Sequence, residues 1–372
     1  MPSPSSPEMS QVGGVMDLAV ARMQLQEYLR QSMPEWVDAE VRNLNEISAG
    51  WESDVYAFDL HVKPDVRESL VLRIYPGADA REKAVREFDG MRRLYNAGYP
   101  VPEVHHLASE ASPFGKPFVI MERVDGRPMW HATFNGPEAR QRACFQRFIE
   151  LFVELHALDW QTLVDDTSVP FVDASGAVEP YAFVDAWLGL FRGYAQQFSL
   201  TDYAPVLDWL AERRDGVPCH RPAPIHWDYH PENLLLRADG TTVVIDWTQY
   251  EISDPRFDLA WTMTLVSSEE GHDVRSSERI RRRILEAYEA RSGEPVEQIE
   301  YFEVFACAKR LASVTISLLA GAETLGMRPG AEAMMRRSLP ALSRVYARLQ
   351  ALTGLRIPDV EVLFEENTTH DA

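Results

Sequence analysis

The chain has few cysteines, no long hydrophobic run and a deficit of positive charge. Its three cysteines, Cys144, Cys219 and Cys307, lie far apart and form no CxxC pair, so they indicate neither a disulfide framework nor a zinc knuckle. Reduced thiols are typical of a cytosol. No stretch reaches the ~18 uncharged apolar residues of a membrane span, and the first residues lack the basic and apolar regions of a signal peptide. We therefore expect a cytoplasmic protein without a membrane partner.

The charge balance argues against one class of partner. The chain has 37 Lys and Arg against 57 Asp and Glu, which gives a net charge of -20. Proteins that bind nucleic-acid phosphates through a general field need clustered Lys and Arg, so we expect no nucleic-acid partner. The acidity mildly favours a cationic small molecule, although it serves solubility equally well.

The length of 372 residues predicts two domains or lobes. Residues 1–14 are rich in Ser, Pro and Gly and are expected to be disordered. We assign 15–123 to an N-terminal nucleotide-binding lobe and 124–364 to a helical C-terminal lobe for catalysis and substrate binding. The polar end, 365–372, is expected to be a flexible tail.

The hydrophobic spacing predicts different structure in the two lobes. After a first helix at 16–30, the N-terminal lobe has strands expected at 44–47, 55–60, 69–75, 104–107 and 118–122, with an amphipathic helix at 79–97. Such an order is typical of a compact α+β unit with an antiparallel sheet. Helices are expected in the second lobe at 137–160, 183–198, 203–214, 259–266, 276–291, 295–320 and 330–352.

One stretch, Ile225–Asp258, concentrates the ionisable residues. It opens with a polar cluster that contains His226, Asp228, His230, Glu232 and Asn233. A turn signal ending at Gly240 follows, and then an apolar run that ends on Asp246. This order predicts a loop followed by a β-hairpin, which would hold reactive side chains on a rigid element.

Three residues of this stretch suit phosphoryl transfer from ATP. The reaction needs a carboxylate to orient the acceptor hydroxyl, and Asp228 can supply it. It also needs hard oxygen ligands for Mg²⁺, and the hairpin would bring Asn233 and Asp246 together for that purpose. An Asp, four residues, an Asn and a later strand that ends in Asp is the protein-kinase arrangement. A second interpretation takes His226, Asp228 and His230 as a metal-binding run of a metallohydrolase. That interpretation leaves Asn233 and Asp246 without a role.

The motifs HWDYHPENLL, VVIDW and DPRFDLAW resemble the aminoglycoside phosphotransferase and choline kinase-like family, small-molecule kinases with the protein-kinase fold. The resemblance implies that Asp228 is the catalytic base and that Asn233 and Asp246 hold the metal. It also implies that Asp258 braces the catalytic loop and that His226 packs beneath it.

The resemblance extends over about residues 40–265 and implies a site for ATP in the N-terminal lobe. The residues expected there are Ser48, Gly50 and Ser53 in the nucleotide loop, Arg73 with its ion-pair partner Glu87, and Glu122 and Val124 at the hinge that meets adenine.

Two residues depart from the family pattern. Trp227 stands where Gly is usual, and it is a possible substrate contact, as is His230. Arg73 stands where the phosphate-binding residue is commonly Lys, and a planar guanidinium does not place its charge as an ammonium does. This second departure leaves open a catalytically silent nucleotide-binding module.

Taken together, the sequence predicts a two-lobed α+β protein with the protein-kinase-like fold. Its N-lobe would hold an antiparallel sheet plus a helix, and its large helical C-lobe would carry the catalytic β-hairpin. The expected function is an ATP- and Mg²⁺-dependent phosphotransferase. It would act on a hydroxyl of a small molecule, either an aminoglycoside-type antibiotic or a metabolite such as choline, homoserine or a sugar.

Overall fold

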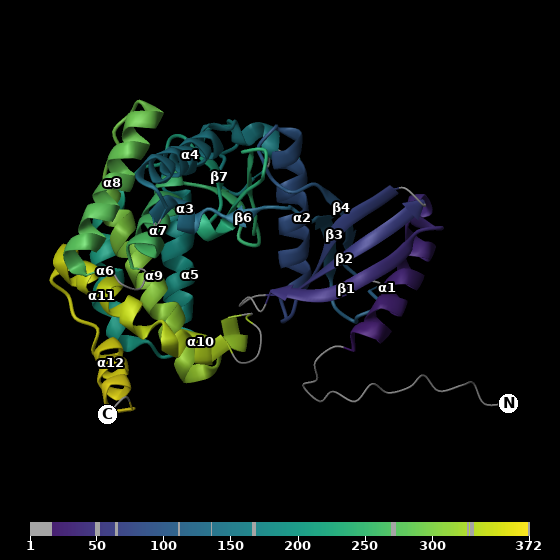
Figure 1. Ribbon diagram of the computed structural model, residues 1–372. Helices are drawn as coiled ribbons and strands as arrows, with labels where there is room; N and C mark the ends of the chain where they lie inside the picture. Colours follow the sequence, from purple (N-terminus) through teal and green to yellow (C-terminus); the bar gives the residue numbers. More distant parts are fainter. Residues whose placement is uncertain are drawn as a thin grey trace.

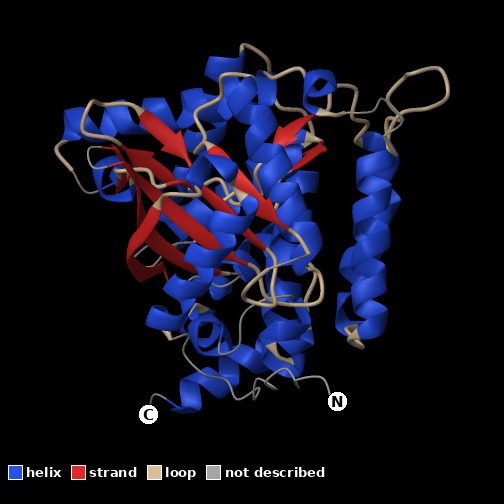
Figure 2. Cartoon of the chain, turned by 90° about the vertical axis from the view of Figure 1, so that its right-hand side faces the viewer, coloured by secondary structure: helices blue, strands red, loops and turns tan. Residues whose placement is uncertain are grey.

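The computed structural model divides the chain into two lobes joined by one extended segment (Figure 1). The residues that it describes are 17–48, 53–63, 66–110, 112–134, 136–165, 169–268, 273–325, 327 and 331–370. Strands gather in the first lobe, and helices make up most of the second (Figure 2). The expected two-lobed α+β fold is confirmed.

The first lobe is built on a five-stranded antiparallel sheet in the order β1-β2-β3-β5-β4. Its strands are β1 (Glu40–Ser48), β2 (Asp54–Lys63), β3 (Val66–Ile74), β4 (Val104–Ala108) and β5 (Phe118–Glu122). Strands β1 and β2 run beyond both of their predicted ends, and β3 begins before its predicted start and ends one residue earlier than predicted, because strand pairing recruits flanking polar residues that alternation alone does not mark.

Alternation along the strands separates the two faces of this sheet. Phe58 and Leu72 point to the outer face, where they form one core with Leu25 and Trp36. These last two residues belong to α1 (Leu18–Ser32) and the short helix η1 (Pro34–Trp36). Because the outer face is closed in this way, the odd-numbered side chains of β3, including Arg73, point towards the second lobe.

The helix α2 (Ala80–Asn96) lies between the sheet and the second lobe (Figure 1). Its contacts with the second lobe are specific: Arg93 donates to the carbonyl of Leu163 at 3.0 Å, and Gly90 faces the ring of Tyr250. The helix therefore carries Glu87 into the space between the lobes, where that side chain is fully buried.

The second lobe is mainly helical. Its α-helices are α3 (Trp130–Phe134), α4 (Glu138–Ala157), α5 (Ala182–Gln197), α6 (Ala204–Arg213), α7 (Pro255–Ser267), α8 (Val274–Ser292), α9 (Ile299–Ala320), α10 (Ala331–Arg337), α11 (Leu339–Thr353) and α12 (Pro358–His370). Single 3-10 turns are η2 (Trp160–Leu163), η3 (Thr201–Tyr203), η4 (Arg214–Gly216), η5 (Pro231–Asn233) and η6 (Ala322–Leu325). Short strands are β6 (Arg127–Pro128), β7 (Ala223–Ile225), β8 (Leu234–Leu236), β9 (Thr242–Val244) and β10 (Glu251–Ser253).

Some boundaries differ from the sequence prediction. The single helix expected at 330–352 is divided into α10 and α11, because Pro340 occupies the first turn of α11, where its missing N–H costs nothing. The pair formed by β7 and β10 was not predicted, since three-residue strands are too short to show a period. Helix α12 runs through much of the segment expected to be a tail. Among the described residues, no helix has the length and apolar character to cross a membrane.

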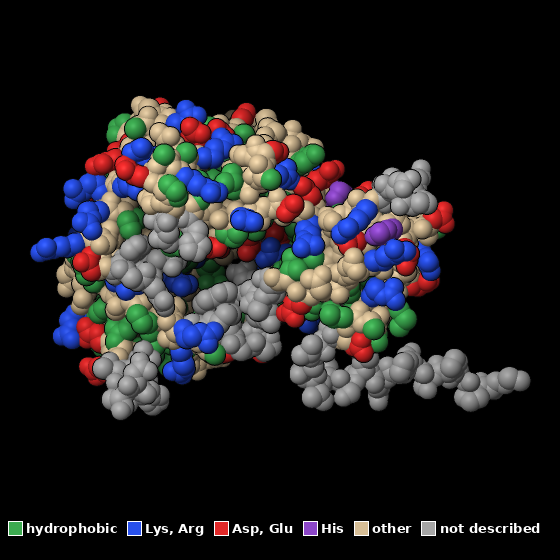
Figure 3. Space-filling view, in the orientation of Figure 1, with side chains coloured by type: hydrophobic (Ala, Val, Ile, Leu, Met, Phe, Trp, Pro, Cys, Tyr) green, Lys and Arg blue, Asp and Glu red, His purple; other side chains and the backbone are tan. Residues whose placement is uncertain are grey.

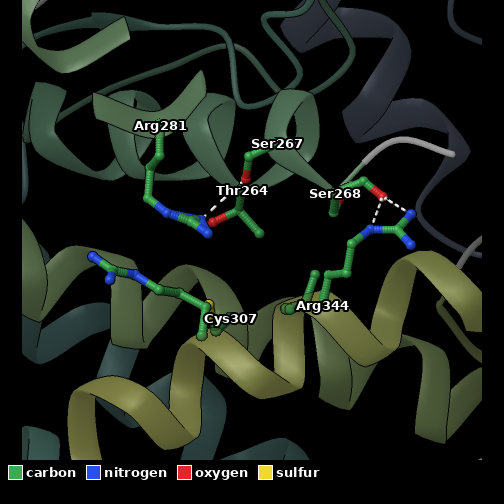
Figure 4. Close-up of a pocket in the computed structure, with 8 residues that line it drawn as sticks. Thr264, Ser267, Ser268, Arg281, Cys307 and Arg344 are labelled. Carbon is green, nitrogen blue, oxygen red and sulfur yellow. Dashed lines mark hydrogen bonds between the residues drawn. The ribbon is translucent and has the colours of Figure 1, made fainter. Parts of the chain in front are cut away.

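A small cavity lies at the carboxyl end of α7 (Figure 4). Arg344 donates to the Ser268 carbonyl from Nε at 3.1 Å, and Arg281 Nη1 donates to Ser267 Oγ at 3.0 Å. Cationic side chains at this position complement the partial negative charge of a helix end. The buried Arg281 and the half-buried Arg344 thus hold the carboxyl end of α7, the helix whose other end enters the candidate site.

The approach of Gly90 to Tyr250 yields a stability test. A Cβ atom at position 90 would lie 2.5 Å from the Tyr250 ring, whereas a Cβ at Gly189 in α5 would meet nothing within 4 Å. We expect Gly90→Ala to lower the free energy of unfolding by about 1–3 kcal/mol through overpacking. Gly189→Ala, the matched control, should raise it by roughly 0.5–1 kcal/mol through helix propensity. Urea unfolding measures the free energy of unfolding of both variants. Equal changes in the two would contradict the close contact between Gly90 and Tyr250.

Candidate active site

A β-hairpin brings two of the candidate residues together. Strand β8 pairs with β9, and the turn between them contains Gly240 in the left-handed conformation, with φ 88°. Beyond the hairpin, the amide of Ile245 donates to the carbonyl of Asn233 at 2.9 Å. This last bond closes the hairpin base, so that Asp246 emerges beside Asn233.

Asp258 organises the loop that precedes the hairpin. Its carboxylate is fully buried and accepts the backbone amides of His226 at 2.7 Å and Trp227 at 2.9 Å. His156 Nε2 lies 3.3 Å from the same carboxylate, and the other nitrogen of that ring is 2.8 Å from the Tyr288 hydroxyl. Since Asp258 stands in the first turn of α7, the loop is fastened to a fixed helix.

Both ring nitrogens of His226 are engaged with the backbone. Nδ1 accepts the amide of Asp228 at 3.2 Å, and Nε2 is 2.9 Å from the carbonyl of Ile245. The ring therefore packs beneath the loop and has no free nitrogen for a metal. Within the described ranges, no three His, Cys, Asp or Glu side chains converge as a metal-binding group. The geometry thus gives no support to a histidine-ligated metal centre.

Asp228 is held in the ionised form. Its Oδ2 accepts Nδ2 of Asn233 at 2.9 Å and lies 3.4 Å from Nε2 of His230. Burial raises the pKa of this carboxyl, but His230, His226 and the Asn233 hydrogen bond outweigh burial and hold the pKa well below its usual value. A third of the side chain stays exposed (34%), so the carboxylate can meet a bound molecule.

Two residues of the site have strained backbones. Trp227 has φ 62° and Asp246 has φ 70°, a region that non-glycine residues rarely adopt. Strain of this kind costs about 1–3 kcal/mol and clusters at functional sites. A glycine would take the conformation of Trp227 freely, which explains in physical terms why the resembling family commonly has Gly there.

Arg73 connects three parts of the structure through its guanidinium. Nε donates to Ser53 Oγ at 2.7 Å, Nη1 to Glu87 Oε1 at 2.9 Å, and Nη2 to Asp246 Oδ1 at 2.8 Å. The side chain is only 10% exposed. An ammonium has no planar fork and would not hold these three acceptors in this geometry. Arg73 is therefore fitted to its surroundings and is not a stray surface charge.

Glu87 receives further hydrogen bonds besides the one from Arg73. The Tyr75 hydroxyl donates to Oε2, and the backbone amide of Trp247 donates to Oε1 at 3.2 Å. Because a buried carboxylate is costly unless it is fully paired, these donors fix both oxygens. Tyr75 was missed by sequence reasoning; the one signal was a hydroxyl-bearing residue next to an apolar strand.

The segment that joins the lobes continues from β5. The amides of Glu122 and Arg123 donate to the sheet, whereas the Val124 amide has no backbone partner in the part of the chain that the structure describes. The Glu122 side chain pairs with Arg237 on the hairpin turn, so it links the lobes. Of the other predicted nucleotide contacts, Gly50 lies outside the described residues, and for Ser48 only the backbone at the end of β1 is described.

The oxygen atoms of Asn233 and Asp246 at the base of the hairpin suit a hard cation. Asn233 donates through Nδ2, so its Oδ1 is the atom of the amide that could accept a cation. Asp246 is 35% exposed, and its Oδ1 accepts Arg73 and, at 3.3 Å, Thr248. Amide and carboxylate oxygens, completed by phosphates and water, are the ligands that Mg²⁺ prefers in such sites.

Residues 43–298 match the model of the phosphotransferase enzyme family, and the chain therefore belongs to this family. Among curated proteins, it is 30% identical over 207 residues to acyl-CoA dehydrogenase family member 10 of Mus musculus. That match covers 52% of this chain but only 18% of the mouse protein, so the chain resembles a small part of a much longer protein.

Solved structures of low identity share the fold. A Ralstonia eutropha JMP134 protein described as an aminoglycoside phosphotransferase has a TM-score of 0.62 at 19% identity, with 90% of this chain and 98% of that chain covered. The ADP and hygromycin B complex of the aminoglycoside phosphotransferase APH(4)-Ia has a TM-score of 0.57 at 18% identity, covering 88% and 98%. An ethanolamine kinase of Plasmodium vivax has a TM-score of 0.56 at 12% identity, covering 90% and 88%. These likenesses show the two-lobed kinase-like fold.

The bracing by Asp258 can be tested by an isosteric change. In Asp258→Asn, a neutral amide replaces a carboxylate that accepts two backbone amides, and we expect a loss of about 2–4 kcal/mol in the free energy of unfolding. The control is Asp208→Asn on the exposed face of α6, which should change it by less than ~0.5 kcal/mol. Unfolding in guanidinium measures the stability of both variants. Equal stability of the two would rule out a bracing role for Asp258.

Proposed function

We propose that the protein is an ATP- and Mg²⁺-dependent phosphotransferase that phosphorylates a hydroxyl of a small molecule. The observation that carries this proposal is the grouping of Asp228, Asn233 and Asp246 at the base of one hairpin, with Arg73 of the other lobe bonded to Asp246. This grouping joins the base, the metal ligands and the phosphate-binding cation that phosphoryl transfer requires.

The nucleotide would lie between the lobes. The Val124 amide, for which the described part of the chain offers no backbone partner, suits the edge of adenine, and Arg73 and Ser53 suit the phosphates. Asn233 and Asp246 would hold Mg²⁺, which supplies charge neutralisation to the phosphates when bound. Arg73 would then exchange part of its bonding with Asp246 for a phosphate oxygen, as its fork geometry permits.

Asp228 would orient the acceptor hydroxyl and take its proton. Its depressed pKa keeps the carboxylate ionised at neutral pH, so that it accepts a hydrogen bond from the hydroxyl. Its hydrogen bond from Asn233 fixes the carboxylate next to the metal ligands. This orientation, and not strong basicity, is what a loose phosphoryl-transfer transition state needs.

Two structural neighbours support a small-molecule acceptor. The APH(4)-Ia complex contains hygromycin B, and the Plasmodium protein is an ethanolamine kinase, so hydroxyl-bearing small molecules recur on this fold. The buried free thiols of Cys144, Cys219 and Cys307 support a cytoplasmic location. A catalytically silent nucleotide-binding protein is the alternative, and turnover separates the two.

Replacement of Asp228 tests the base. Asp228→Ala should lower kcat by about 10²–10⁴-fold on an accepted substrate, because it removes the group that orients the hydroxyl. ATP binding, read from the rise in Tm with nucleotide, should be retained. Asp208→Ala on α6 serves as the control and should match the unaltered protein. Near-normal kcat in Asp228→Ala would show that another group takes the proton.

Replacement of Asn233 tests the metal site. In the unaltered protein, ATP should raise Tm more with Mg²⁺ than without it, because ligand binding to the native state stabilises by mass action. Asn233→Ala should lose most of this Mg²⁺ increment and keep the effect of ATP alone. A thermal-shift series with Mg²⁺ and EDTA measures both. An unchanged increment would contradict the ligand role.

A further inference from the structure

An ammonium group sits among three tryptophans next to the catalytic loop. Lys309 Nζ, from α9, lies 3.8 Å from the ring centroid of Trp227, 4.4 Å from that of Trp261 and 5.2 Å from that of Trp187. The three rings come from the loop, α7 and α5, so separate parts of the second lobe converge on one cation. We call this group the tryptophan cage.

A carboxylate completes the cage. Glu251 accepts Nε1 of Trp227 at 2.7 Å, and Trp187 is a further hydrogen-bonding neighbour. Lys309 and Arg86 both act on this carboxylate electrostatically. The charges of two cations therefore act on this single anion.

The cage lies next to the loop that carries Asp228, because one of its rings belongs to the preceding residue, Trp227. Trp227 immediately precedes Asp228, so the Lys309 ammonium lies within about 15 Å of the Asp228 carboxylate by chain geometry. The charge of Arg86, on α2 of the other lobe, also acts on Glu251 of this group. The surface of the molecule is hollowed between the two lobes (Figure 3). Lys309 and Trp187 are partly exposed, whereas Trp227 is buried beneath them.

We infer that Lys309 is the cation that recognises the acceptor, and that the acceptor carries an anionic group, a carboxylate or a phosphate, in addition to the hydroxyl oriented by Asp228. This inference rests on the proposed function, whose acceptor class it specifies. Trp227 is then a positioning residue, since it holds the ammonium and does not itself meet the acceptor.

The physical reason is that the cage is already filled. Several aromatic faces around one point are the surface with which proteins bind ammonium and quaternary ammonium ligands. Here the chain supplies the ammonium itself, from Lys309. A cationic acceptor could therefore not bind between the rings and would be repelled by a like charge. An anion instead gains a charge-assisted hydrogen bond from Lys309. The cage thus favours an anionic acceptor, whereas the net negative charge of the whole chain mildly favours a cationic one.

The competing interpretation makes Lys309 only an internal partner of Glu251. Both interpretations predict that removing Lys309 affects stability, so stability does not separate them. They differ in one respect. Removal of a recognition residue changes the ratio of kcat/KM between acceptors of different charge, whereas removal of an internal partner changes kcat/KM for all acceptors alike.

The test uses four acceptors on one para-hydroxymethylphenyl frame, bearing a carboxylate, a phosphate ester, a carboxamide or a trimethylammonium group. With the full chain and Mg²⁺-ATP, kcat/KM should be at least about tenfold higher for the anionic members than for the trimethylammonium member. Lys309→Met should lower kcat/KM for the anionic members about 10–100-fold, mainly through KM, and leave the carboxamide within about twofold. The carboxylate and phosphate arms identify which anion is preferred.

Matched variants guard against a folding defect. Lys309→Met leaves Glu251 without its lysine, so the double variant Glu251→Gln with Lys309→Met removes both charges and should show the same loss of anion preference. Glu251→Gln alone keeps an oxygen that accepts the indole N–H of Trp227, and it keeps the Lys309 ammonium. This variant should retain the preference for anionic acceptors. Arg282→Met on the exposed surface of α8 removes a distant cation and should change nothing. The rise in Tm with Mg²⁺-ATP reports whether each variant is folded.

Binding of the same four compounds to the ATP-loaded protein, measured by calorimetry, separates the two hypotheses. The inference is overturned if the trimethylammonium member is bound or turned over best, if Lys309→Met affects all four equally, or if no compound binds in a Lys309-dependent way. Lys309-dependent anion binding without any turnover supports the inference about the acceptor and counts against the proposed function alone.

Discussion

The fork of Arg73 is the contact on which the relation between the two lobes depends. Through one guanidinium it joins Ser53 just before β2, helix α2 at Glu87 and the end of the hairpin at Asp246. Breaking a buried ion pair by removing one partner leaves an unpaired charge, which costs about 3–5 kcal/mol. The sheet, α2 and the hairpin of β8 and β9 are therefore fixed with respect to one another by electrostatics as well as by packing.

Around this fork, each reactive group is oriented by a neighbour that does no chemistry. Asp258 holds the loop, His226 fills the space beneath it, and Thr262 on α7 donates to the carbonyl of Tyr229 at 2.9 Å. Asp254 caps the same helix by accepting the amide of Arg256 at 3.0 Å. The site is thus built from backbone acceptors and donors supplied by rigid elements, which is how a geometry accurate to fractions of an ångström is maintained.

Much of this arrangement was readable from the sequence, because it is local. The spacing of Asp228, Asn233 and Asp246 on a hairpin, and the pairing of Arg73 with Glu87, follow from motif and helix position. The bond from Arg73 to Asp246 and the tryptophan cage were not predicted, since they join residues that are distant in the chain. Nor does a pattern reveal that Lys309 turns inward, because a lysine on a helix is usually solvated.

The left-handed backbone of Trp227 has a consequence for how this chain can change. The strain it carries, roughly 1–3 kcal/mol, is offset by burial of the ring and by its bond to Glu251. Substitutions of the residues around that ring weaken these stabilising contacts, and so lower the stability of the fold. Trp227 and its neighbours therefore have to change together if the fold is to be kept.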